Sequence, residues 1–196
     1  MQYQGIKFQV DLTAASIPSD HRVDELRKWC HIFHEKGLTP PYPGGSYGNL
    51  SFRIKTGQGS FLITGSSIGL KEDLTEDDFV LVKQCDLEKK IIKAVGLRDP
   101  SSESMLHHAI YQVRNDINAI FHGHCPEILH HADHFKIPQT SRLVPYGTLE
   151  LVNSVLEVLD DHCFLVIKNH GFIAMGKNMQ AAGDNAIYFH KKCAKE

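Results

Sequence analysis

The stretch SSESMLHHAIYQVRNDINAIFHGH, residues 101–124, holds the helix-then-strand pattern that decides the fold class. Ser101 and Ser102 are good helix caps, so a helix is predicted from Glu103 to Arg114. A short polar turn then leads to an apolar run, Asn118 to His122, that predicts a strand. A strand that follows a helix so closely is typical of an α/β domain.

The rest of the chain repeats this mixture of helices and strands. Further helices are predicted at Asp20 to Lys36, after Thr148, and from about Met179 to Cys193. Further strands are predicted at Leu50 to Ile54, Ser60 to Thr64, Phe79 to Lys83, Lys90 to Val95 and Cys163 to Ile167. No repeat or linker interrupts the pattern, so residues 1–196 are expected to form a single layered α/β domain. The pattern does not determine the strand order.

The composition is that of an ordinary globular domain, with 42% hydrophobic and 22% charged residues among 196. A net charge of −2 supplies no basic face for nucleic acid or anionic lipid. The five cysteines contain no Cys-x-x-Cys pair, which favours a reducing compartment. The first residues lack the pattern of a secretory signal, and no apolar stretch approaches the roughly 20 residues that span a bilayer. We therefore expect a cytoplasmic protein with no nucleic-acid or membrane partner.

The motif His122-Gly123-His124 lies at the end of a predicted strand. Side chains alternate along a strand, so both imidazoles lie on one face and can reach one ion. Zinc accepts imidazole nitrogen at about 2.0–2.1 Å, and three protein ligands leave one position open for substrate. Coincidence is the alternative, because 13 histidines in 196 positions give roughly one His-x-His at random. The motif alone does not decide between the two.

His170 and Glu103 are further candidates for the same site. His170 follows a buried strand, and strand ends are where α/β folds generally place their chemistry. A turn histidine that bonds a backbone group is the alternative. Glu103 stands at a helix start, where a carboxylate is either a first-turn acid stabilised by the helix dipole or a general acid/base near a metal.

Three short polar segments are suited to binding phosphate through hydroxyl and backbone N–H groups. They are Gly44 to Ser51 (GGSYGNLS), Thr64 to Gly69 (TGSSIG), and Ser101 with Ser102. None matches a P-loop or a dinucleotide-binding fingerprint, and each alone is more often a turn. Lys and Arg are scarce in these segments, so a phosphate would be held mainly by neutral donors.

Taken together, these segments resemble the class II aldolase/adducin family, whose aldolases cleave phosphorylated sugars such as L-fuculose phosphate. The resemblance runs from about Asp24 to the C-terminus. Its markers occur in family order, and the ordered set is far more specific than any one of them. They are Gly48-Asn49-Leu50-Ser51, Leu62-Ile63-Thr64-Gly65-Ser66-Ser67, Pro100-Ser101-Ser102-Glu103, His122-Gly123-His124 and Asn169-His170-Gly171.

The resemblance implies a three-layer α/β/α sandwich around a mostly antiparallel central sheet, assembled as a homotetramer with active sites between subunits. It also implies about one zinc or other divalent ion per chain, held by His122, His124 and His170. Glu103 resembles the family's catalytic carboxylate. The residues that resemble its substrate phosphate-binding set are Gly48, Asn49, Ser66, Ser67, Ser101 and Ser102.

Three neutral imidazoles leave the charge of zinc available as a Lewis acid, so a chelated hydroxy-ketone would lose a C–H proton to Glu103 and form a stabilised enediolate. The family uses this intermediate for aldol cleavage, epimerisation and dehydration. The expected function is therefore a zinc-dependent lyase acting on a small phosphorylated sugar, with a sugar-phosphate epimerase or dehydratase as the alternative. A non-catalytic adducin-like interaction domain is a third reading, and the presence of all three histidines and Glu103 argues against it.

One departure from the family pattern concerns the second proton donor. Fuculose-type aldolases carry a tyrosine a few residues after an Ile-Pro, and aligning on Ile137-Pro138 places Arg142 there. An arginine stays protonated and is a poor donor, but it pairs well with anionic groups. We therefore expect weak activity on L-fuculose 1-phosphate and a preference for a substrate with an added anionic group. Tyr146 and the histidines at 130, 131 and 134 are alternative donors.

Overall fold

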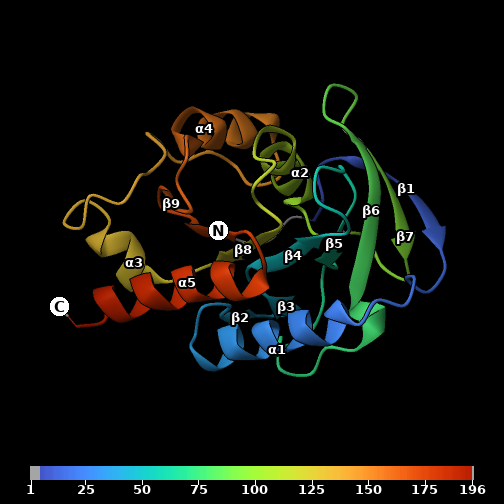
Figure 1. Ribbon diagram of the computed structural model, residues 1–196, viewed down its shortest axis with the longest axis horizontal. Helices are drawn as coiled ribbons and strands as arrows, with labels where there is room; N and C mark the ends of the chain where they lie inside the picture. Colours follow the sequence, from blue (N-terminus) through green and yellow to red (C-terminus); the bar gives the residue numbers. More distant parts are fainter. Residues whose placement is uncertain (1–4, 196) are drawn as a thin grey trace.

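The computed structural model describes residues 5–195, and most strands of this part of the chain join one eight-stranded sheet (Figure 1). The order across the sheet is β1-β7-β6-β5-β4-β8-β10-β9. The pair β1–β7 is parallel, and the other neighbouring pairs are antiparallel. The strands are β1 (Gln9–Ala14), β4 (Asn49–Arg53), β5 (Phe61–Thr64), β6 (Phe79–Asp86), β7 (Ile91–Gly96), β8 (Ala119–Gly123), β9 (Phe164–Ile167) and β10 (Gly171–Gly176), with a separate hairpin of β2 (Pro41–Tyr42) and β3 (Gly45–Ser46).

Helices cover both faces of the sheet (Figure 1). They are α1 (Arg22–Glu35), α2 (Ser104–Val113), α3 (Pro126–His131), α4 (Leu149–Leu159) and α5 (Met179–Cys193), and a 3-10 turn lies at Glu76–Asp78. Helices α1, α3 and α5 pack on one face and α2 and α4 on the other. The predicted α/β fold with a large sheet is confirmed.

Successive side chains of β8 pack alternately into the two apolar cores on opposite faces of the sheet. Phe121 faces α1 and packs edge-on against Phe33, with ring centroids 5.5 Å apart. Its neighbour Ile120 belongs to the core on the opposite face, beneath α2 and α4. Successive side chains of a strand point to opposite faces, so a central strand covered on both sides is apolar throughout.

Several elements were not predicted. They are β1, the small hairpin β2–β3, the short helix α3 and strand β10. Strand β1 lies at the edge of the sheet, and its side chains are only partly buried or exposed, so it lacks the apolar signal of a core strand. Strand β10 begins at Gly171, directly after the turn that carries His170, and is buried along its whole length.

Two glycines allow the central strands to approach closely where the histidines lie. Gly48 has a φ of +76°, and a Cβ there would lie 2.6 Å from the carbonyl oxygen of His122. At Gly171, a Cβ would lie 2.5 Å from the carbonyl oxygen of Gly123 and 2.8 Å from Cε1 of His122. Any larger residue would push β4 or β10 away from β8, which lies between them.

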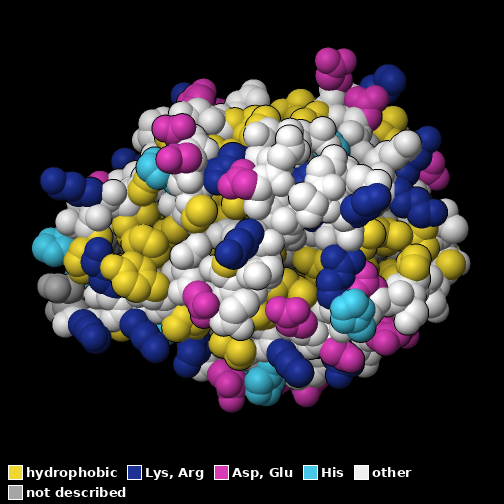
Figure 2. Space-filling model, viewed as in Figure 1, with side chains coloured by type: hydrophobic (Ala, Val, Ile, Leu, Met, Phe, Trp, Pro, Cys, Tyr) yellow, Lys and Arg dark blue, Asp and Glu magenta, His cyan; other side chains and the backbone are white. Residues whose placement is uncertain are grey.

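The surface viewed in Figure 2 carries acidic and basic side chains mixed together, with no broad field of one sign. Within residues 5–195, no helix has both the length and the apolar character needed to cross a membrane.

Candidate active site

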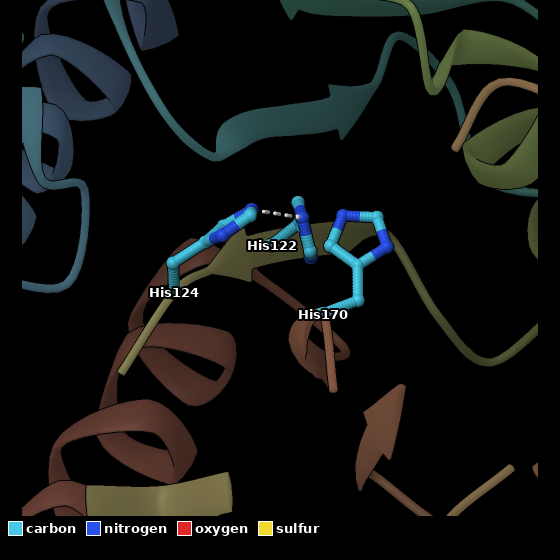
Figure 3. Close-up of side chains that lie close together, drawn as sticks. All are labelled: His122, His124 and His170. Atoms are coloured by element: carbon cyan, nitrogen blue, oxygen red, sulfur yellow. Dashed lines mark hydrogen bonds between the residues drawn. The ribbon is translucent and has the colours of Figure 1, made fainter. Parts of the chain in front are cut away.

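Three imidazoles meet at one edge of the sheet (Figure 3). His122 and His124 come from the end of β8, and His170 comes from the turn between β9 and β10. One ligand atom from each lies within 4.8 Å of those of the other two. The ring centroids are 4.9 to 5.1 Å apart. The structure therefore brings together the three residues predicted as metal ligands.

The hydrogen bonds of His122 identify the nitrogen that faces this centre. Its Nδ1 lies 2.8 Å from the backbone carbonyl oxygen of Phe172. A carbonyl only accepts, so Nδ1 carries a proton, and in the neutral ring Nε2 keeps its lone pair. Such a bond to the far nitrogen is how proteins orient metal-ligating histidines. The Nε2 atoms of His122 and His124 are 3.1 Å apart.

Burial keeps the neighbouring imidazoles neutral. It lowers the pKa of His124 well below its usual value and lowers the pKa of His170 to about 4, against the opposing effect of Glu103 on His170. A metal binds the neutral form of imidazole, so these two side chains are ready to act as ligands at neutral pH.

Glu103 lies against two of these histidines rather than capping its helix. It occupies the N-cap position of α2, but its side chain makes no capping hydrogen bond. Instead, Oε2 lies 3.0 Å from Nε2 of His122 and Oε1 lies 3.3 Å from Nε2 of His170. The amide nitrogen of Asn49 donates to Oε2 at 2.8 Å. The side chain is thus turned into the histidine cluster, as the acid/base interpretation requires.

The surroundings of Glu103 act on its protonation in opposite directions. Burial raises the pKa of this carboxyl, whereas His122, His170 and the Asn49 amide lower it and outweigh burial. The net effect is a pKa below the usual value for a glutamate. Glu103 is ionised and is suited to accept a proton.

These groups fit a divalent cation. Glu103 Oε1 is buried and has no hydrogen-bond donor among the described residues. The Glu103 carboxylate and the lone pair on Nε2 of His122 both need a positive partner, and only a proton or a cation can lie between them. Three imidazole nitrogens with an adjacent carboxylate match the ligand preferences of zinc and its neighbours.

A cavity of about 360 Å³ opens over the cluster. Glu103, His124 and His170 line it, while His122 is fully buried behind them. All the residues predicted to bind phosphate also line it, namely Gly48, Asn49, Ser66, Ser67, Ser101 and Ser102. The described lining includes no Lys or Arg.

The two serine loops are joined by backbone hydrogen bonds, and this limits which groups can bind an anion. The backbone N–H of Ser66 donates to the carbonyl of Asp99, and that of Ser101 donates to the carbonyl of Thr64. These two N–H groups are therefore engaged within the protein. The serine hydroxyls are left as the principal contribution of Ser66 and Ser101 to the cavity.

Two residues near the site, Tyr47 and Lys71, were not identified from the sequence. The Tyr47 ring stacks on the His124 imidazole, with centroids 4.9 Å apart and an interplanar angle of 27°. The Lys71 side chain is 1% exposed and donates to Ser46 Oγ at 3.0 Å and to the Tyr47 carbonyl at 3.2 Å. Tyr47 lies in an irregular loop, and Lys71 stands in a polar stretch that is typical of exposed surface, so neither has a local signal.

Of the alternative proton donors, Tyr146 lines the cavity, whereas the histidines at 130, 131 and 134 are not part of the described lining. Arg142 is also outside that lining. Its guanidinium lies 3.0 Å from Glu150 Oε1 at the surface, with a side chain that is 68% exposed. Within this chain, Arg142 therefore does not supply the cavity with an anion-binding group.

The sequence model of the family described as "Class II Aldolase and Adducin N-terminal domain" matches residues 24–195. The chain belongs to this family. It is a class II aldolase-like enzyme, and the resemblance noted in its motifs is confirmed.

Relatives support the same assignment along most of the chain. An L-fuculose phosphate aldolase from Methanococcus maripaludis is 31% identical over 173 residues, covering 81% of this chain and 86% of the relative. A 5-deoxy-D-ribulose 1-phosphate aldolase from Bacillus thuringiensis serovar kurstaki is 32% identical over 164 residues, covering 76% and 74%. Among solved structures, an L-fuculose 1-phosphate aldolase has a TM-score of 0.73 at 27% identity, covering 92% of this chain and 86% of that one.

Proposed function

We propose that this class II aldolase-like protein is a zinc-dependent lyase that cleaves a carbon–carbon bond in a small ketose 1-phosphate. The observation that carries this proposal is the position of Glu103, a buried carboxylate that contacts two clustered histidines and forms part of the cavity wall. The relatives named as aldolases of L-fuculose phosphate and 5-deoxy-D-ribulose 1-phosphate support the choice of substrate class. We propose that residues 1–196 act as one domain in the cytoplasm.

His122, His124 and His170 would hold the metal, because their nitrogens converge and their imidazoles are suited to bind as neutral ligands. When bound, the ion supplies a Lewis acid beside the hydroxyl and carbonyl oxygens of the substrate. The Nδ1–H bond from His122 to the Phe172 carbonyl keeps the ligating nitrogen directed at the centre.

The phosphate of the substrate would bind at the other part of the cavity, where the serine side chains gather. Hydroxyls of Ser66, Ser67, Ser101 and Ser102 would donate to its oxygens, with the Gly48–Asn49 turn beside them. Neutral donors hold a phosphate in place without a nearby cation to neutralise it, so shape and hydrogen bonding have more weight here than charge.

Glu103 would move the proton during the reaction. Its carboxylate is ionised, the Asn49 amide fixes Oε2, and Oε1 has no hydrogen-bond donor among the described residues. In the cleavage direction Glu103 would act in its protonated form and give its proton to the carbon next to the carbonyl, while the hydroxyl at the broken bond loses its own proton and becomes the aldehyde. In the direction of bond formation it removes that proton.

The family resemblance also supports assembly as a homotetramer with active sites between subunits. Light scattering at micromolar concentration should give a mass near that of four chains, and a clean monomer would contradict this part of the proposal.

The function is tested by incubating zinc-loaded protein with a panel of ketose 1-phosphates and following the products by NMR. Aldol cleavage releases dihydroxyacetone phosphate and an aldehyde from the same substrate in equal amounts. Epimerisation gives an isomer without fragmentation, and dehydration gives one product with loss of water. An isomer as the product would replace the lyase proposal with an epimerase, and loss of water would replace it with a dehydratase. In both cases the same residues would form the site.

A further inference from the structure

A row of buried polar side chains connects β4 with α2 beneath the site. Asn49 and Ser51 are two residues apart on β4, so their side chains lie on the same face of the strand. Glu103 at the N-cap of α2 is followed at intervals of four by His107 and Tyr111, which lie on one face of that helix. The two rows face each other, and these five residues are called the polar ladder.

The contacts across the polar ladder are short. Asn49 Nδ2 donates to Glu103 Oε2 at 2.8 Å. Ser51 Oγ lies 2.7 Å from His107 Nδ1 and 2.9 Å from the Tyr111 hydroxyl. Ser51, His107 and Tyr111 are each 0% exposed. Buried polar groups at these distances strengthen one another, and losing one partner leaves the other unsatisfied at a cost of about 1–3 kcal/mol.

Arg53 extends the same face of β4 and anchors the far end of the ladder. Its Nη2 donates to the Tyr111 carbonyl at 2.7 Å, and its guanidinium lies 4.6 Å from the centroid of the Tyr111 ring. Its Nε also donates to the carbonyl of Ile117 at 3.1 Å. The C-terminal part of α2 is therefore fixed to β4, so the N-terminal end that carries Glu103 has little freedom to rotate.

The hydrogen bonds around Ser51 favour one tautomer of His107. The Tyr111 hydroxyl lies 2.9 Å from Ser51 Oγ and can donate to it. Ser51 has one hydroxyl proton, which can go to Nδ1 of His107 at 2.7 Å or to the Ile120 carbonyl at 3.5 Å, and the much shorter contact favours His107 as the acceptor. His107 then carries its proton on Nε2. This atom is buried and has no hydrogen-bond partner among the described residues.

Burial also prevents His107 from taking a second proton. It lowers the pKa of this imidazole to about 3, although the Glu103 carboxylate acts in the opposite direction. The Glu103 carboxylate and His122 both interact electrostatically with the His107 ring. The side chain one turn below the acid/base residue is therefore a neutral group with a fixed donor.

We propose that Ser51 and His107 are positioning residues for the proton transfer by Glu103. The hydrogen bond between Ser51 and the Nε2–H tautomer of His107 holds the first turn of α2, which carries Glu103, against β4, which carries Asn49. Among the described residues, neither Ser51 nor His107 lines the cavity or forms a hydrogen bond with the three clustered histidines. They act by fixing the position of the Glu103 carboxylate. This inference rests on the proposed function. Misplacing a proton carrier by about 1 Å can cost roughly 100-fold in rate.

The test begins with Ser51→Ala, which removes the central hydroxyl without adding volume. We expect kcat to fall at least 10-fold, with KM within about twofold of wild type and the metal content unchanged. Ser51→Thr keeps the hydroxyl and should recover most of the rate. The matched control is Ser154→Ala, because Ser154 is also buried and bonded, to the Leu151 carbonyl at 2.9 Å, but lies in α4 away from the ladder.

A double-mutant comparison separates positioning from a general loss of structure. If Ser51 acts through Glu103, adding Ser51→Ala to Glu103→Gln should cause no further loss of kcat. The same fold loss in both backgrounds, or an equal loss in Ser154→Ala, would overturn the proposal. No loss in Ser51→Ala would do so too.

Side-chain nitrogen NMR of the metal-loaded protein gives a readout that does not depend on turnover. His107 should show a proton on Nε2 and an acceptor at Nδ1, and Ser51→Ala should alter the Nδ1 signal. A proton on Nδ1 would overturn the ladder whatever the activity. If no ketose phosphate is cleaved and the Nε2–H signal is present, the ladder stands and the proposed lyase function fails.

Discussion

The Nε2 nitrogen of His122 lies 3.0 Å from Oε2 of Glu103, while the opposite nitrogen of the same ring is held by the Phe172 carbonyl. With the far nitrogen acting as donor, the neutral ring presents only a lone pair to an ionised carboxylate. This arrangement is stable only when a proton or a cation compensates the two acceptors. The geometry therefore favours a proton or a divalent cation between these two groups.

The first prediction concerns this cation. Protein purified without chelator should carry about one divalent ion per chain, and His122→Ala and His170→Ala should each lose it. Elemental analysis measures the content, and a chelator should lower the thermal stability of wild type but not of the two variants. His162→Ala is the matched control, because His162 is exposed and outside the cluster. Full metal retention in both variants would remove them from the ligand set.

Replacing Glu103 tests the acid/base role separately from metal binding. Glu103→Gln keeps the size of the side chain and the contact with Asn49, so the metal content should not change. Turnover should fall by about 10²–10⁴-fold, the usual contribution of a general acid/base group. Glu157→Gln, at an exposed position of α4, is the control. Activity of Glu103→Gln within a factor of two of wild type would exclude Glu103 from the mechanism.

Arg142 gives a prediction about specificity. It pairs with Glu150 at the surface and does not line the cavity, so Arg142→Ala should change KM by less than about twofold. A tenfold rise in KM for a substrate with a second anionic group would show instead that Arg142 reaches the substrate in the assembled protein. Weak turnover of L-fuculose 1-phosphate stays a prediction. A kcat/KM at or above about 10⁴ M⁻¹s⁻¹ would contradict it.

The parts of the site that could be predicted are those with local signals. His122 and His124 flank one glycine at the end of an apolar strand, and Ser101 and Ser102 precede a helix. The ordered family motifs then placed these separate signals in one site. The short distance between His122 and Glu103 depends on the packing of α2 on the sheet, which no local pattern encodes.

The polar ladder illustrates what could not be predicted. Ser51 and His107 are 56 residues apart, and their contact requires α2 to pack over β4. In the sequence, His107 is simply one of two adjacent histidines in an amphipathic helix. Strand β1 was missed for a different reason, since an edge strand with little burial has a weak hydrophobic pattern.

Gly183 in α5 provides a stability prediction in the core beside β8. A Cβ at this position would overlap the ring of Trp29 from α1, which is itself packed at 5.8 Å from the Phe121 ring. Alanine is the better helix former by about 1 kcal/mol, but overpacking a dense core typically costs about 1–3 kcal/mol. Gly183→Ala should therefore destabilise the protein in chemical denaturation.

A second substitution checks the cause. In a Trp29→Phe background the smaller ring leaves room, so adding Gly183→Ala should cost less than it does in wild type. Gln180→Ala, at an exposed position of the same helix, should be nearly neutral. An equal cost of Gly183→Ala in both backgrounds would show that the Trp29 contact is not responsible.

Lys71 gives the last prediction, a dependence of stability on pH. The ammonium group is buried, its hydrogen bonds go to neutral oxygens, and burial lowers its pKa from 10.5 to about 8. Between about pH 8 and 10.5 the unfolded chain therefore binds more protons at this position, and the free energy of unfolding rises with pH. At about 1.4 kcal/mol per pH unit, the full gain is roughly 3 kcal/mol.

The measurement must separate Lys71 from other groups whose pKa is shifted. Burial raises the pKa of Cys30 to about 12, for example, so the quantity to measure is a difference between variants. The free energy of unfolding of wild type minus that of Lys71→Met should rise by about 3 kcal/mol from pH 8 to 10.5. The same difference taken with Lys28→Met, an exposed position of α1, should stay flat. A flat difference for Lys71→Met would show that the lysine keeps an ordinary pKa in spite of its burial.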